Sequence, residues 1–335
     1  MTKEFHNTDL TARNSFHVAQ RAARLVEFDS ANDLQQLFGG SGRPEKWMVL
    51  AGGNNILFTQ DYDGTLVVPC GRRIDVTGDD PQATYVRAEA GVEWDDLVEW
   101  AVGRNLWGLE NLSLIPGKVG AAPVQNIGAY GAEAAGTITD VEMFCPETMN
   151  MLTMAAEHCA FGYRDSIFKR SLKGRVVITA VRFRLSKQPQ PNVAYGDLQR
   201  EVEARGGASL RNIRDAVCAI RRSKLPDTAV LGNAGSFFKN PVVDPATAQR
   251  LAGEYPQMPV YRTAAGVKLA AGWLIEQAGM KGCTDGRAGV HDRQALVLVN
   301  SGGATGAEII ALARRVQQRV KEMFGVEIET EVNII

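Results

Sequence analysis

The stretch IPGKVGAAPVQNIGAYG, residues 115–131, guides the interpretation of the whole chain because it fits no regular element. Glycine and proline interrupt it too often for a helix or a strand, and Lys118 is its only charged residue. Linkers are polar, so an apolar loop is expected to be packed. Small side chains allow the backbone to approach a flat, uncharged partner such as a large cofactor ring. A buried crossing of two backbones is the alternative.

An earlier glycine-rich segment, AGGNNILF at residues 51–58, follows an apolar run and leads into another. Glycine and asparagine tolerate positive φ, so this turn can direct several backbone N–H groups at one point and bind an anion. An ordinary turn between two strands is the alternative. Taken alone, so short a motif favours the ordinary turn.

Two helices can be recognised from their periodicity in the first two-thirds of the chain. Residues 93–101 place Trp94, Leu97, Val98 and Ala101 on one helical face, with acidic residues in the first turn, and we expect these apolar side chains in the core. A second helix carries Ile213, Val217 and Ile220 on one face and must end before Pro226.

The C-terminal region predicts a capped helix followed by a strand. Thr305 and Glu308 have the spacing of a capping box, and Gly325 is placed to end the helix. The expected apolar face consists of Ile309, Leu312, Ala313, Val316, Val320 and Phe324. Strict alternation over residues 326–334 predicts a strand with Val326, Ile328, Thr330, Val332 and Ile334 on one side.

The composition argues against several classes of protein. The 37 basic and 38 acidic residues leave a net charge of −1, so nucleic acid is not an expected partner. The N-terminus does not resemble a secretory signal, and no apolar run approaches the ~20 residues that span a bilayer, so we expect a cytoplasmic protein without membrane contact. The five cysteines and four histidines lack ligand spacing, so buried or incidental thiols are expected, and no metal.

Two common catalytic arrangements do not fit the chain. Ser236 lies in GNAGSFFKNP at residues 232–241, which lacks the G-x-S-x-G elbow of acyl-transfer nucleophiles. No G-x-G-x-x-G string is present, so a nicotinamide cofactor would have to bind without a Rossmann fingerprint.

Taken together, the segments resemble the UDP-N-acetylenolpyruvoylglucosamine reductase family, and the resemblance covers nearly the whole chain in order. The matching strings are GGNNIL (52–57), GLENL (108–112), IPGKVG (115–120), QNIGAYG (125–131), YRDS (163–166), YGDL (195–198), KLPD (224–227), GNAGSFFKNP (232–241), KLAAGWLI (268–275) and QALVL (294–298). Each string is a modest signal, but ten in the correct order are specific. The segment around YGDL resembles the longer of the two family types, in which a tyrosine loop folds over the substrate.

The resemblance implies an α+β protein with a two-part FAD-binding region of the vanillyl-alcohol-oxidase (PCMH) type and a smaller C-terminal α+β substrate domain. The expected parts are residues 1–72, joined by the C-terminal strand 326–335, then 73–210, and finally 211–325. The implied reaction is reduction of an enolpyruvyl UDP-sugar by NADPH through FAD. No oligomeric partner is predicted.

The resemblance also implies roles for individual residues. Ser236 is the expected proton donor, assisted by Arg164 and Glu331. The expected FAD contacts are Gly52, Gly53, Asn54, Asn55, Ile56, Leu57, Pro116, Gly117, Gly120, Ala121, Gln125, Asn126, Ile127 and Gly128. The expected substrate contacts are Tyr130, Tyr163, Tyr195, Lys224, Asn240 and Gln294. From pattern alone Glu331 is one of three equivalent acids on a polar strand face, and Arg164 is an ordinary surface arginine.

The chain departs from the family pattern at Asn54, where a small serine is usual, and at Ala121 and Ala122, where serine or glycine is common. Hydroxyl contacts to FAD at these positions are lost, which bears on flavin affinity. Two alternatives remain. One is another FAD-dependent oxidoreductase of the same fold acting on a small alcohol or sugar. The other is a non-catalytic nucleotide-binding or regulatory protein.

Overall fold

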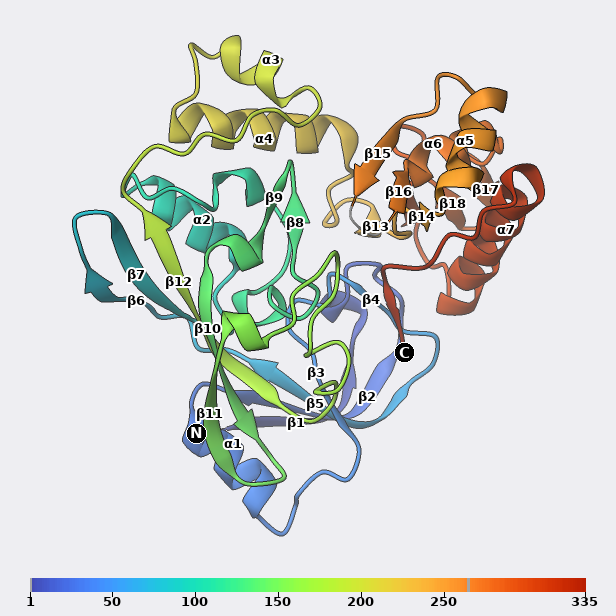
Figure 1. The fold of residues 1–335 in the computed structure, drawn as a ribbon. Coiled ribbons are helices and arrows are strands. Elements are labelled where there is room, and N and C mark those ends of the chain that lie inside the picture. The colour runs from blue at the N-terminus through green and yellow to red at the C-terminus, as the bar shows by residue number, and fades with distance from the viewer. Residues whose placement is uncertain (1, 264–265) are drawn as a thin grey trace. The chain divides into compact units, whose positions relative to one another are not determined.

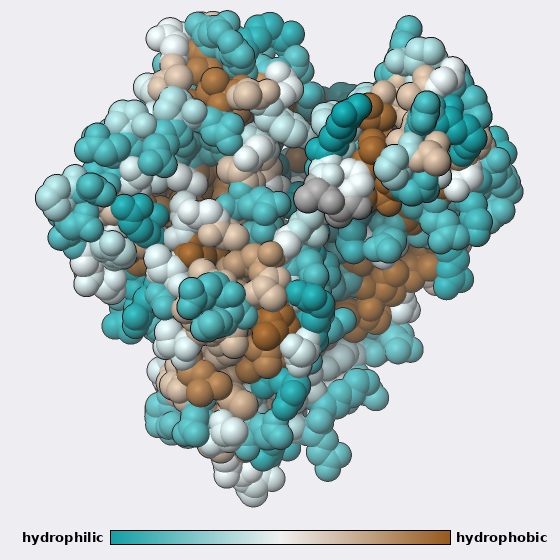
Figure 2. All heavy atoms as spheres, viewed as in Figure 1, coloured by the Kyte–Doolittle hydropathy of each residue, from teal (hydrophilic) through white to brown (hydrophobic). Residues whose placement is uncertain are grey.

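The computed structural model describes residues 2–263 and 266–335, and the chain divides into two compact units. Unit 1 contains the chain up to Thr8, Ala22–Gly52 and Asp63–Ser223. Unit 2 contains Asp9–Arg21, Gly53–Tyr62 and Lys224–Ile335. Figure 1 shows the elements of both units, and Figure 2 shows that hydrophilic residues cover most of the surface in the same view.

Unit 1 is built on two sheets. The first has the order β1 (Lys3–Asp9), β2 (Arg21–Phe28), β5 (Tyr62–Pro69) and β3 (Trp47–Val49), and β3 runs parallel to β5. The second is antiparallel, with the order β11 (Asn150–Ala155), β10 (Ile138–Cys145), β12 (Val177–Ser186), β7 (Ala83–Glu89) and β6 (Ile74–Asp79). A short hairpin joins β8 (Gly128–Ala129) to β9 (Ala132–Glu133).

The helices of unit 1 are α1 (Ala31–Gly39), α2 (Trp94–Val102), α3 (Leu198–Glu203) and α4 (Leu210–Lys224). The predicted face of α2 is buried, and Trp94 Nε1 donates to the Leu112 carbonyl at 2.9 Å, so this tryptophan packs in the core as expected. Helix α4 buries Ile213, Val217 and Ile220 in that same core and ends before Pro226. The sequence boundary at 210/211 therefore falls at the start of a helix that packs in unit 1; the three-part division itself stays a prediction.

Within its described residues, unit 2 combines short sheets with three α-helices. One sheet has the order β13 (Gly232–Ser236), β19 (Val297–Asn300), β18 (Ala288–Val290) and β17 (Thr284–Asp285). Another has the order β14 (Val242–Val243), β16 (Gly266–Leu269) and β15 (Val260–Thr263), and β20 (Asn333–Ile334) pairs in parallel with β4 (Ile56–Leu57). The helices are α5 (Pro245–Glu254), α6 (Ala271–Gln277) and α7 (Gly306–Phe324).

Helix α7 confirms the predicted caps and apolar face. Thr305 and Glu308 form both hydrogen bonds of the capping box, Gly325 has a left-handed φ of 69°, and all six predicted face residues are buried. The predicted strand over 326–334 is too long, because only Asn333–Ile334 forms a strand and Thr330 makes an isolated bridge to Phe238. Alternating burial is correct for Val326, Ile328 and Val332, whereas Ile334 is 45% exposed. Alternation requires only an extended backbone, which the chain keeps without a continuous ladder.

Candidate active site

The glycine-rich loop 115–131 is attached to the rest of unit 1 through its backbone. Gly117 O accepts from Trp94 N at 2.8 Å, Val119 N donates to Val92 O at 2.9 Å, and Gly120 N donates to Ala90 O at 3.0 Å. A Cβ on Gly120 would lie 2.6 Å from that of Ala90, so only glycine permits this approach. The loop turns as a 3₁₀ helix at Val119–Ala121 and is otherwise irregular up to β8, as predicted.

Most of the predicted cofactor contacts in this loop are small or apolar residues. The predicted cofactor contacts Gly117, Gly120, Ala121, Gln125, Ile127 and Gly128 are all half-buried, and Pro116 is exposed. Such a surface lets a flat ring lie against backbone. The residues present therefore fit an isoalloxazine ring.

Asn126 is the exception among the predicted cofactor contacts of this loop. Its side chain is buried, and its Nδ2 donates to Glu133 Oε2 at 2.7 Å and to Gly162 O at 3.1 Å. Its Oδ1 accepts from Ala135 N at 3.0 Å. The amide is therefore used within the protein, where it ties the glycine-rich loop to the segment that carries Arg164.

Arg164 is fixed against that loop. Its backbone has a left-handed φ of 54°, its Nη2 donates to Gly128 O at 2.7 Å, and its guanidinium lies 5.4 Å from the Tyr163 ring centroid. Positive φ is uncommon for an arginine and carries strain that the surrounding contacts must offset. Unit 1 thus brings together three predicted residues, Gly128, Tyr163 and Arg164.

Tyr130 and Tyr195 form a second group in unit 1. Their rings meet edge to face with centroids 6.0 Å apart, although 65 residues of sequence separate them. The Asn111 Nδ2 group donates to Tyr130 O at 2.8 Å and to Asn192 O at 2.7 Å, and Asn192 Nδ2 donates to Gly131 O at 3.0 Å. Tyr195 is 51% exposed on the loop that these bonds hold.

The turn that contains the first glycine motif lies mostly in unit 2. Gly53 has a φ of 64°, and a Cβ there would lie 2.1 Å from the Arg13 carbonyl oxygen, so the protein's own backbone requires glycine at this position. Asn55 O accepts from both Asn333 N (3.1 Å) and Asn333 Nδ2 (3.0 Å). Gly52, Asn54 and Ile56 are half-buried and Leu57 is buried. A role in binding pyrophosphate stays a prediction.

Ser236 ends strand β13, where the backbone ladder sets its position. It faces Val297 in the register of β13 and β19, and Phe237 N donates to Leu296 O at 2.7 Å. Glu331 N donates to Phe237 O at 2.8 Å. Unit 2 therefore places the predicted proton donor and the predicted glutamate on neighbouring segments, which the sequence could not show.

Asn240 and Gln294 each lie next to the start of helix α6. Asn240 Oδ1 accepts from Ala271 N at 2.9 Å. A Cβ on Gly272 would lie 3.2 Å from Gln294 Oε1, so the glycine makes room for this side chain. Lys224 is exposed at the C-terminal end of α4.

Two residues next to the predicted site of unit 1 were not predicted from the sequence. Asn111, only 2% exposed, holds the loops of Tyr130 and Tyr195, and Arg221 donates its Nε to Leu114 O at 3.1 Å, next to the glycine-rich loop. Burial lowers the pKa of Arg221. Burial also raises the pKa of Tyr130, and the positive charge of Arg221 partly offsets this increase. In the sequence, Asn111 is marked only by the motif GLENL. Arg221 is marked only by its place in the helical turn before Lys224.

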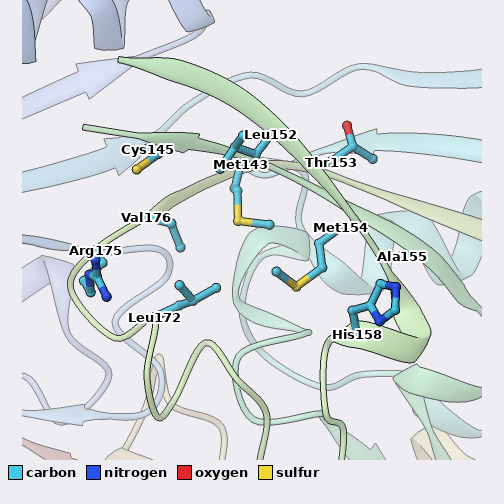
Figure 3. Close-up of a pocket in the computed structure, with 10 residues that line it drawn as sticks. All are labelled: Met143, Cys145, Leu152, Thr153, Met154, Ala155, His158, Leu172, Arg175 and Val176. Atoms are coloured by element: carbon cyan, nitrogen blue, oxygen red, sulfur yellow. The ribbon is translucent and has the colours of Figure 1, made fainter. Parts of the chain in front are cut away.

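A cavity of about 450 Å³ lies elsewhere in unit 1, and none of the predicted site residues lines it. Figure 3 shows its apolar and sulfur-containing lining, with Arg175 and His158 among the labelled side chains. All five cysteines are free, three of them buried, which agrees with incidental thiols. In the described part of the chain no group of three or more His, Cys, Asp or Glu could hold a metal, and no helix is long and apolar enough to cross a membrane.

Comparison with known proteins gives matches along the whole chain. The family model "FAD binding domain" matches residues 22–145, and "UDP-N-acetylenolpyruvoylglucosamine reductase, C-terminal domain" matches residues 226–335. The UDP-N-acetylenolpyruvoylglucosamine reductase of Chromobacterium violaceum is 49% identical over 345 residues and covers 100% of both chains. That of Burkholderia ambifaria is 52% identical and covers 97% of this chain and 93% of its own.

A solved structure supports the fold. The UDP-N-acetylenolpyruvylglucosamine reductase of Thermus caldophilus aligns over 100% of this chain and 98% of its own with a TM-score of 0.70, at 23% identity. The predicted α+β architecture, with a FAD-binding region of the vanillyl-alcohol-oxidase type and a C-terminal α+β domain, is confirmed. FAD is confirmed as the cofactor.

Proposed function

The chain belongs to the UDP-N-acetylenolpyruvoylglucosamine reductase family, and we propose that it reduces UDP-N-acetylglucosamine enolpyruvate to UDP-N-acetylmuramate, with NADPH as the reductant. This reaction belongs to peptidoglycan precursor synthesis and would take place in the cytoplasm. The observation that carries the proposal is the 49% identity over the full length of a named reductase. The arrangement of Ser236, Glu331, Asn240 and Gln294 within unit 2 supports it.

FAD, when bound, would supply hydride chemistry at its N5 position. On the protein side, the small-residue surface of loop 115–131 is the proposed seat of the ring, and the turn 52–57 is the proposed seat of the pyrophosphate. The proposed FAD-binding parts remain residues 1–72, with 326–335, and 73–210.

Reduction of an alkene next to a carboxylate leaves enolate-like charge that the protein must stabilise and protonate. Arg164 is the proposed partner of this carboxylate, because a guanidinium presents two parallel N–H groups to a planar anion. Its bond to Gly128 O fixes the orientation of the guanidinium before the ligand arrives. The strain in its backbone is consistent with a site that is set in advance.

Ser236 is the proposed proton donor. An alcohol is a weak acid, so its position and nearby charge must compensate. The ladder formed by Phe237 with Leu296 and with Glu331 supports that position through backbone groups, and the Asn233 side chain accepts from Gly235 N at 2.9 Å, directly before Ser236. Glu331 is proposed to assist proton transfer, and Lys224, Asn240, Gln294, Tyr130, Tyr163 and Tyr195 to bind the nucleotide.

Product analysis tests the proposal. The FAD-loaded protein is incubated with NADPH and the enolpyruvyl nucleotide, and the nucleotide is examined by mass spectrometry. The expected product has gained two hydrogens, and its formation requires NADPH. An unchanged nucleotide, together with flavin reduction by a small alcohol or sugar, would instead identify another oxidoreductase of the same fold. A purified protein that takes up no FAD would point to a non-catalytic nucleotide-binding protein.

A further inference from the structure

Helix α4 carries two arginines, Arg214 and Arg221, whose surroundings differ sharply. They are seven residues apart, two helical turns, and so lie on nearly the same side of the helix. Arg214 is buried and forms two hydrogen bonds to the Asp95 carboxylate, at 2.7 and 3.0 Å, with Glu99 at 3.5 Å. Its charge is therefore fully matched within the protein.

Arg221 has no such carboxylate. Its hydrogen bond in the structure runs from Nε to Leu114 O, and no acidic group among residues 2–263 and 266–335 forms an ion pair with it. Asp95 contributes attraction from a distance, but its oxygens are already engaged by Arg214 and by Leu114 N at 2.6 Å. The Nη groups of Arg221, which carry most of its N–H donors, are thus left for another partner.

The position of Arg221 is built with strain. Leu114 has a left-handed φ of 57°, unusual for a bulky residue. Its N–H donates to Asp95 and its carbonyl accepts from Arg221, so two charged side chains hold this conformation from both sides. Leu114 immediately precedes the glycine-rich loop 115–131, and strained backbone that the surroundings enforce is concentrated at functional sites.

The remaining neighbours of Arg221 also point to a ligand. Arg164 acts on its charge by repulsion. Two guanidiniums that repel each other, without a carboxylate paired to Arg221, raise the energy of the ligand-free protein. An anion that meets them relieves this cost.

We propose that Arg221 is an anion-binding residue of the active site, whose Nη groups contact an oxyanion of the bound nucleotide. This inference rests on the proposed function. Two oxyanions of that substrate have the required chemistry, the enolpyruvyl carboxylate and the pyrophosphate. The helix places Lys224 one turn after Arg221, so α4 would supply two cations to the same ligand.

Binding to the oxidised, FAD-loaded protein tests the proposal without turnover. The flavin spectrum is titrated with the enolpyruvyl nucleotide and with UDP-N-acetylglucosamine, which keeps the pyrophosphate but lacks the carboxylate. Arg221→Met is expected to raise the Kd of the enolpyruvyl nucleotide about 10- to 100-fold. An unchanged Kd for UDP-N-acetylglucosamine identifies the carboxylate as the partner, and an equal loss for both ligands identifies the pyrophosphate.

Three variants control the test. Arg222→Met removes a charge from the exposed neighbouring position and should bind both ligands as the wild type does. Arg214→Met should lower Tm and leave the Kd values of the folded protein unchanged, because its role is structural. Arg221→Lys keeps the charge but loses the fork, and a several-fold higher Kd is expected.

A folded Arg221→Met protein with wild-type Kd values for both nucleotides would overturn the proposal, as would a change limited to the flavin midpoint potential. If Arg221→Met does not fold, a wild-type Kd in Arg221→Lys overturns it instead. A wild-type protein that binds the enolpyruvyl nucleotide but never reduces it would contradict the proposed function without contradicting the Arg221 contact.

Discussion

The two units hold their candidate residues in opposite ways. In unit 1, Arg164 and Tyr130 have left-handed backbones that buried asparagine amides and arginine contacts maintain. In unit 2, Ser236 and Glu331 sit on extended segments joined by backbone hydrogen bonds. In unit 2 the Asn55 side chain also donates to Glu331 O at 3.3 Å, and the Asn233 side chain accepts from Gly235 N at 2.9 Å. The extended segments nevertheless keep their backbone pairing, whereas the loops of unit 1 depend on particular amides.

This difference predicts which substitutions affect the reaction and which affect the stability of the fold. Substitutions at the unit 2 residues should change the reaction and leave the fold intact, whereas substitutions around the unit 1 loops should affect stability as well. The following variants test this contrast, beginning with the largest expected effect.

Ser236→Ala should show chemistry lost with the fold preserved. The rate of substrate reduction is expected to fall about 10³-fold, within the range for removal of a general acid, with Tm unchanged. NADPH should still reduce the flavin at the wild-type rate, which stopped-flow absorbance measures. Equal losses in both half-reactions would indicate a structural role for Ser236.

Asn126→Ala should show the opposite behaviour. The substitution leaves the Glu133 carboxylate, the Gly162 carbonyl and the Ala135 N–H without their amide partner, at a φ of 45° that alanine disfavours. The free energy of unfolding is expected to fall by about 3 kcal/mol, as measured in urea.

Asn333→Ala is the matched control for Asn126→Ala. Its Nδ2 bond to Asn55 O duplicates a backbone bond from Asn333 N, so we expect a loss below about 1 kcal/mol. Similar losses for the two variants would remove the contrast between the units.

Arg164→Lys should combine both effects. A lysine keeps the charge but cannot bind Gly128 O and a planar carboxylate with one fork, so kcat/KM for the enolpyruvyl nucleotide is expected to fall about 10- to 100-fold. Steady-state kinetics measure this. Arg170→Lys, an exposed position on the same loop, should stay at the wild-type value. Wild-type kcat/KM in Arg164→Lys would contradict the assigned role.

The two capping boxes should give the smallest and most similar effects. Ser30 with Asp33 caps α1 in unit 1, and Thr305 with Glu308 caps α7 in unit 2. Ser30→Ala and Thr305→Ala are each expected to cost about 1 kcal/mol in urea unfolding, with no change in kcat. A difference of several kcal/mol would show that the units differ in more than their loops.

Local patterns allowed much of the fold to be predicted. Helices α2, α4 and α7 follow from periodicity and capping, because the residues that determine them are within a few turns. The C-terminal strand was predicted too long, since alternating burial between Val326 and Val332 does not require ladder bonds.

The site was less accessible to such reasoning. Asn111 meets Asn192 across 81 residues, and Arg221 meets Leu114 across 107, so no local spacing reveals either contact. Ser236 and Glu331 are assigned only through the family motifs, because a serine after a glycine turn and an acid among three acids have no distinguishing pattern.

Two anaerobic additions, followed by the visible spectrum, test the central claim most directly. NADPH should bleach the flavin of the purified protein, and the enolpyruvyl nucleotide should then restore the oxidised spectrum in a stoichiometric amount. A reduced flavin that stays bleached after the nucleotide is added would contradict the account.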